Sequence, residues 1–82
     1  GRHSQRRMIY VQRILQIAEI VASRHFGVTV EDLKRELAEA GDAVCVRTIQ
    51  RYLNIFTYLG YISREEIYPH GVRLIRYRTA RQ

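Results

Sequence analysis

The chain is poor in the residues that cross-link, kink or anchor small proteins. Its 82 residues hold one cysteine, one proline, one methionine and no tryptophan. Cys45 alone cannot form an intramolecular disulfide, and it cannot supply the sulfur ligands of a structural zinc site. A reducing compartment inside the cell therefore fits best. No run of 18 apolar residues is present, so we expect no membrane span.

Patterns typical of catalysis and metal binding are also missing. The three histidines, His3, His25 and His70, are scattered without metal-ligand spacing. The sequence contains no nucleophile–base pair and no phosphate-binding loop, and its length leaves little room for a substrate pocket. Glu65 and Glu66 resemble a carboxylate pair, but adjacent residues of a strand point to opposite faces. We therefore predict that the protein is not an enzyme and needs no metal or cofactor.

Lysine and acidic residues are scarce beside arginine. Lys34 is the only lysine among 14 basic residues, and eight acidic residues leave a formal net charge of +6. Residues 1–28 carry five arginines against one glutamate, and residues 43–82 carry seven against two, whereas residues 29–42 carry five acidic residues against two basic ones. Arginine pairs bidentately with phosphate and with guanine. This distribution predicts one globular domain with a nucleic-acid-binding face.

The apolar spacing predicts three helices. The first covers residues 6–25, where Val11, Leu15, Ala18 and Ala22 form one apolar line and Ile9, Ile14, Ile17, Ile20 and Val21 widen it. This surface is wider than one surface helix needs. We expect most of it to lie in the core. A contact with a second copy or another domain through Ile9 and Ile20 is the alternative.

The second and third helices are separated by a short turn. Thr29 and Asp32 have the spacing of a capping box, which begins a helix over residues 30–40 that Gly41 ends. A third helix begins near Cys45 and ends at Gly60. Its predicted buried stripe is Ile49, Leu53, Phe56 and Leu59. Its other face carries Arg47, Thr48, Gln50, Arg51 and Asn54. Two short helices joined in this way form a helix-turn-helix, whose second helix enters the major groove.

After Gly60 the pattern changes to that of a hairpin. Ile62–Tyr68 and Val72–Arg78 are the two predicted strands, joined by the turn residues Pro69, His70 and Gly71. The strands carry Arg64, Arg73, Arg76 and Arg78. We expect these charges to contact phosphate or the minor groove. A solvated edge that discourages aggregation is the alternative.

These elements together resemble a known family. The stretches from Val28 to Leu33, from Val44 to Leu53 and from Leu59 to Ile62 are similar to the DNA-binding domains of DeoR-type and WYL-type bacterial transcription regulators, and to the winged helix of the biotin repressor. The resemblance implies an α+β winged helix-turn-helix over residues 6–78. Residues 1–5 would be an arm or a cleavage scar, and residues 79–82 a tail or linker.

Two residues depart from the family pattern. Cys45 stands where the family has a serine N-cap, so Asp42 could cap the third helix instead. Tyr52 stands where the family has aspartate, which makes that helix more basic.

The resemblance also implies a function. We expect sequence-specific binding to double-stranded DNA by a homodimeric regulator, a repressor or an activator, with residues 46–58 in the major groove. Such a protein would lie in the cytoplasm of a bacterium or a phage-infected cell, near the nucleoid, and a sensor domain could follow Gln82. The predicted DNA-binding residues are Val46, Arg47, Thr48, Gln50, Arg51, Asn54, Arg64, His70, Arg73 and Arg76. The alternative is a protein-interaction module that uses the first helix and Tyr52.

Overall fold

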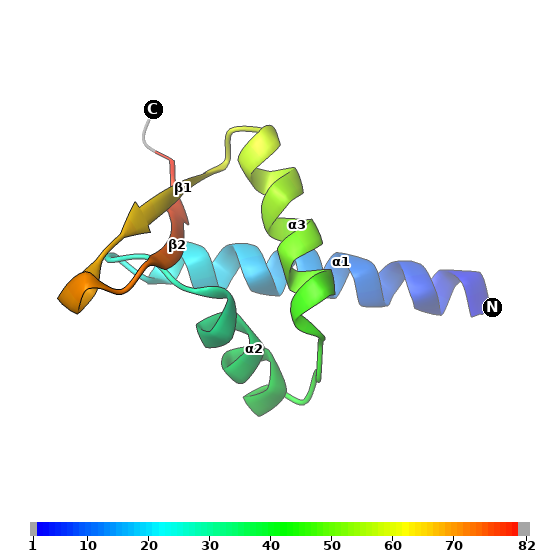
Figure 1. The fold of residues 1–82 in the computed structure, drawn as a ribbon. Coiled ribbons are helices and arrows are strands. Elements are labelled where there is room, and N and C mark those ends of the chain that lie inside the picture. The colour runs from blue at the N-terminus through cyan, green and yellow to red at the C-terminus, as the bar shows by residue number, and fades with distance from the viewer. Residues whose placement is uncertain (1, 81–82) are drawn as a thin grey trace.

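The chain folds into three helices followed by an antiparallel hairpin (Figure 1). The computed structural model describes the backbone of residues 2–80 and the side chains of residues 8–80. The elements are α1 (Arg2–Ser23), α2 (Val30–Glu39), α3 (Val46–Tyr58), β1 (Ile62–Ile67), the 3-10 turn η1 (Pro69–Gly71) and β2 (Leu74–Thr79). The predicted α+β winged helix-turn-helix is confirmed.

Helix α1 differs from its prediction at both ends and in its burial. It begins at Arg2, four residues before the predicted start, and it ends at Ser23. Only Ile17 and Val21 of its described side chains are buried. The expectation that most of its apolar residues lie in the core was wrong. A helix of 22 residues is about 33 Å long, and its N-terminal half projects beyond α3, where no other element covers it (Figure 1).

Local hydrogen bonds fix where α2 and α3 begin and end. The Thr29 side chain accepts from the Asp32 amide, and the Asp32 carboxylate accepts from the Thr29 amide, both at 3.1 Å, which confirms the capping box. Gly60 has a φ of 81°, and the amide of Tyr61 donates to the Phe56 carbonyl at 3.0 Å. This is the Schellman ending that glycine permits.

The hairpin is attached to the helices through β2. Strands β1 and β2 pair in a register that places Arg64 opposite Tyr77 and Glu65 opposite Arg76. Val28, in the predicted extended link after α1, forms a bridge to Tyr77 with N–H···O distances of 2.8 and 2.7 Å. Thr79 belongs to β2, so the strand continues into the predicted tail. Residues 81–82 of that tail lie outside the described residues.

One apolar core holds these elements together. Its fully buried side chains are Tyr77, Ile17, Leu33, Leu37, Ile49, Leu53, Val21 and Val28. Phe56 is also buried, but Leu59, the fourth member of the stripe predicted on α3, is 53% exposed. Leu59 is the C-cap of α3, so the chain turns away from the core at this residue. Within residues 2–80, no helix is long and apolar enough to cross a membrane.

Replacement of a core leucine should test this packing. Leu53→Ala removes a side chain with 0% exposure, and we expect it to lower the free energy of unfolding by about 2–5 kcal/mol, because it leaves a cavity. Leu59→Ala on the same helix is the matched control, and it should change stability by less than about 1 kcal/mol. Urea denaturation followed by circular dichroism measures both. Equal losses in the two variants would contradict the described core.

Candidate nucleic-acid interface

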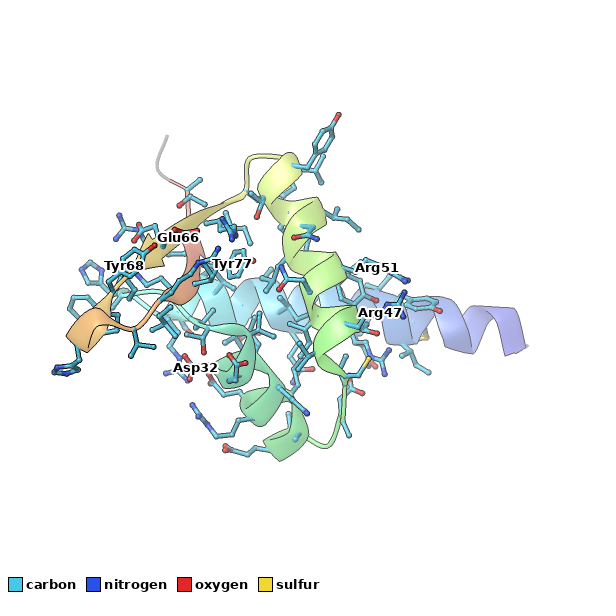
Figure 2. The ribbon with its side chains drawn as sticks, in the orientation of Figure 1. Asp32, Arg47, Arg51, Glu66, Tyr68 and Tyr77 are labelled. Atoms are coloured by element: carbon cyan, nitrogen blue, oxygen red, sulfur yellow. The ribbon has the colours of Figure 1, made fainter. Side chains whose placement is uncertain are left out.

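The outward face of α3 gathers five of the predicted site residues. A shallow surface groove is lined by Val46, Arg47, Gln50, Arg51, Asn54 and Ile55. Arg47 and Arg51 are four residues apart, so they lie one above the other, and both project from the same side of α3 (Figure 2). Ile55 was not predicted as a site residue. Its position on the polar side of the helix, four residues after Arg51, could have identified it as part of this surface.

No carboxylate among the described side chains pairs with the arginines of α3. Among the described side chains, ion pairs engage Arg13, Arg24, Arg35, Arg73, Arg76 and Arg78. None engages Arg47, Arg51 or Arg64 within the described part of the chain. Helix α3 contains no acidic residue. Among the described side chains, the guanidinium groups without an ion pair therefore lie on α3 and on β1.

The side chain of Gln50 forms two hydrogen bonds within the domain. Its side-chain Nε2 donates to the Tyr77 hydroxyl at 2.7 Å and to Asn54 Oδ1 at 3.1 Å. Tyr77 is only 1% exposed, so the first bond links the outward side of α3 to the core of the hairpin. The bond leaves Gln50 Oε1 and the Asn54 amide nitrogen as the groups of this pair that can meet a ligand. Sequence analysis missed the role of Tyr77, because both faces of its strand mix apolar and charged residues.

The N-terminus of α3 has no side-chain cap from Cys45. Cys45 occupies the N-cap position with extended backbone, but its side chain makes no capping bond. Its Sγ lies 3.2 Å from Thr48 Oγ1, and this contact lowers the pKa of the thiol. Thr48 is half-buried and does not line the groove with its neighbours.

Asp42 does not cap α3. Its carboxylate accepts from Arg13 Nε at 2.9 Å and from Arg13 Nη2 at 3.1 Å. This pair lowers the pKa of Asp42 and fixes the turn before α3 against α1. The suggested capping by Asp42 was therefore wrong. Among the described side chains, Asp42 forms no ion pair with Arg47.

Most of the basic wing side chains are paired. Arg73 donates to Glu66 at 2.7 Å, which lowers the pKa of that carboxyl, and Arg76 donates to Glu65 at 2.9 Å. Arg64 on β1 is exposed and has no carboxylate partner among the described residues. His70 is exposed in the turn and has a φ of 55°, a left-handed conformation that is uncommon outside glycine.

Helix α2 differs from α3 in that it carries acidic residues, and several of these form ion pairs. Glu36 pairs with Arg24, and Arg35 bonds to Asp32 at 3.2 Å. These pairs place Asp32 and Glu36 beside arginines of α2 and of the preceding link. Within the described residues, no group of three or more histidine, cysteine or acidic side chains is arranged to hold a metal ion.

Comparisons with known proteins support the fold. No protein-family model matches the chain, and no curated protein matches it significantly in sequence. A solved structure of the Vibrio cholerae ferric uptake regulator (Fur) is similar, with a TM-score of 0.65 and 24% identity. The match covers 85% of this chain and 52% of the Fur chain, so this chain spans about half of the Fur chain's length. That structure is described as revealing a rearrangement of the DNA-binding domains of Fur. The resemblance to DeoR-type and WYL-type regulators stays a prediction.

The bond between Gln50 and Tyr77 can be tested by removing one hydroxyl. Tyr77→Phe should cost about 1 kcal/mol of stability, because a part-buried hydrogen bond is lost while the ring keeps its packing. Tyr58→Phe, at a side chain that is 89% exposed, is the control and should change stability by less than about 0.5 kcal/mol. Chemical denaturation measures both. If Tyr77→Phe leaves the free energy of unfolding unchanged, the bond does not contribute to stability.

Proposed function

We propose that the protein binds double-stranded DNA, with α3 in the major groove and the hairpin beside it. The observation that carries the proposal is the arrangement of charge. Arg47 and Arg51 lie together on the outward face of the second helix of a helix-turn-helix, and neither has a carboxylate partner among the described side chains. Guanidinium groups in this position can pair with phosphate or with the O6 and N7 atoms of guanine.

The remaining groove residues suit base contact of a limited kind. Val46 and Ile55 offer apolar surface that can meet a thymine methyl group. A free glutamine can read adenine through both atoms of its amide. Since Nε2 of Gln50 is bonded to Tyr77 and Asn54, we expect Gln50 to contact a base through Oε1, as an acceptor. Thr48 remains a proposed phosphate contact at the edge of this surface.

The hairpin would add contacts to the DNA backbone. Arg64 can bind phosphate without losing a protein partner. Arg73 and Arg76 would first exchange Glu66 and Glu65 for phosphate, so they should contribute less. His70 at the tip completes the proposed wing contacts. The paired acidic groups of α2 suit a helix that braces α3 and does not itself approach phosphate.

The regulatory role is also a proposal. We propose a bacterial or phage transcription regulator of the DeoR or WYL type, acting as a homodimeric repressor in the cytoplasm. The likeness to Fur supports this role, because Fur is itself a regulator with DNA-binding domains. We propose no catalytic activity. We propose that a sensor domain could lie elsewhere in a longer protein, since the match covers only 52% of the Fur chain. In the alternative interaction module, the exposed apolar residues of α1 would be available to a partner, whereas Tyr52 packs half-buried against the core.

Removal of two charges from α3 should weaken DNA binding. For the wild type, we expect log K for random duplex DNA to fall linearly with log salt. In Arg47→Ala/Arg51→Ala that slope should be shallower by about 1.8, because two phosphate contacts are lost at about 0.9 each. Fluorescence anisotropy over a salt series measures both quantities.

The matched control removes the same charge from α2. Lys34→Ala/Arg35→Ala should keep the wild-type slope, because neither residue faces DNA in the proposed complex. Two results would contradict the proposal in different ways. A wild type without salt-dependent affinity would overturn DNA binding itself. A slope that changes equally in both double variants would overturn the assignment of α3.

A further inference from the structure

The amide nitrogen of Gln50 uses both of its hydrogens inside the domain. A glutamine amide nitrogen carries two hydrogens, and its oxygen carries none. One hydrogen of Gln50 Nε2 is donated to the Tyr77 hydroxyl at 2.7 Å, and the other is donated to Asn54 Oδ1 at 3.1 Å. Gln50 also lines the groove on α3. The polar atom that it offers to a ligand there is Oε1, which can only accept a hydrogen bond.

The position of Tyr77 determines the direction of this amide. The side chain of Tyr77 is only 1% exposed. Its backbone exchanges two hydrogen bonds with Val28, at N···O distances of 2.7 and 2.8 Å. The hydroxyl is therefore held at one place beside α3. If the Gln50 amide turned over, its Oε1 would meet Asn54 Oδ1, and neither oxygen carries a hydrogen for a bond.

The other side chains of the groove do not offer the same chemistry. Arg47 and Arg51 carry hydrogen-bond donors only, which suit the O6 and N7 acceptors of guanine. Val46 and Ile55 have no polar group in their side chains. An acceptor among these residues adds a separate selectivity, because it needs a donor on the base.

In the major groove, the donors are the amino groups of adenine and cytosine. Adenine presents N6 and cytosine presents N4, whereas guanine presents O6 and thymine presents O4. A glutamine with both amide atoms free singles out adenine, since it donates to N7 while it accepts from N6. An acceptor alone does not separate adenine from cytosine. It disfavours guanine and thymine, because two oxygens would then face each other without a hydrogen.

We infer that Tyr77 is a positioning residue for sequence recognition: its hydroxyl restricts Gln50 to accepting a hydrogen bond, so that one position of the bound DNA is read as adenine or cytosine. This inference rests on the proposed function, because it needs α3 in the major groove. It adds to that function the class of base that one side chain selects. Tyr77 is buried and acts only through Gln50.

Selection from a duplex library measures this preference. The chain is mixed at low salt with duplexes whose central segment is random, and the bound duplexes are sequenced. The position read by Gln50 is the one whose preference disappears in Gln50→Ala. There the wild type should favour adenine and cytosine over guanine and thymine by about 3- to 10-fold, which is the range for one hydrogen bond.

Tyr77→Phe should change this preference and keep DNA binding. Without the hydroxyl, one hydrogen of Gln50 Nε2 is free to bond adenine N7. Adenine should then exceed cytosine by about 3- to 10-fold at the same position. A loss of stability alone lowers the affinity for all duplexes alike. Tyr58→Phe, at a side chain that is 89% exposed, is the matched control and should keep the wild-type preference.

Gln50→Glu provides a second test of the same bond. A carboxylate accepts hydrogen bonds and has none to donate. Gln50→Glu should therefore keep the preference for adenine and cytosine, and addition of Tyr77→Phe should not change it. Circular dichroism checks that every variant is folded. A preference for adenine that arises in Gln50→Glu/Tyr77→Phe would show that Tyr77 does not act through the Gln50 amide.

Other results also overturn the inference. The wild type could favour guanine or thymine at this position, or adenine alone, or show no position that depends on Gln50. A Tyr77→Phe variant with the wild-type preference would also contradict it. Failure of the proposed function is a different result, namely a wild type without salt-dependent affinity for random duplex DNA. That result would overturn both proposals.

Discussion

Tyr77 is the residue on which the arrangement of the domain depends. Its backbone bridges to Val28 in the link after α1, and its strand pairs with β1 opposite Arg64. Its ring is buried in the core, and its hydroxyl accepts a hydrogen bond from Gln50 on α3. One residue therefore connects the link after α1, the hairpin and the proposed recognition helix. The angle between hairpin and α3 determines whether both can contact one duplex.

The distribution of carboxylates determines which arginines remain available. Asp42 engages Arg13, Glu36 engages Arg24, and Glu65 and Glu66 engage arginines of the hairpin. These pairs are partly exposed, so each contributes little to stability. Their greater effect is to neutralise positive charge away from α3. The net charge of +6 is thus less informative than the position of the few arginines that form no ion pair among the described residues.

Local sequence patterns predicted the elements well, because caps and turns are decided by neighbouring residues. The Thr29–Asp32 box, the glycine after α3 and the Pro69–Gly71 turn each depend on contacts within a few positions. Burial on α1 could not be predicted in the same way. Val11 and Leu15 repeat at helical spacing as a core stripe would, but both are exposed, and Leu15 lies about 160° around α1 from buried Ile17. The bond from Gln50 to Tyr77 spans 27 residues and has no local signature.

The central claim is that α3 is the surface that meets DNA. The most direct measurement is a titration of the labelled chain with a random duplex at low salt, followed by amide chemical shifts. If α3 meets DNA, the largest changes should occur over residues 46–54, added salt should reverse them, and the amides of α2 from Val30 to Glu39 should change little. Large changes on α2, with the α3 amides unmoved, would contradict this claim.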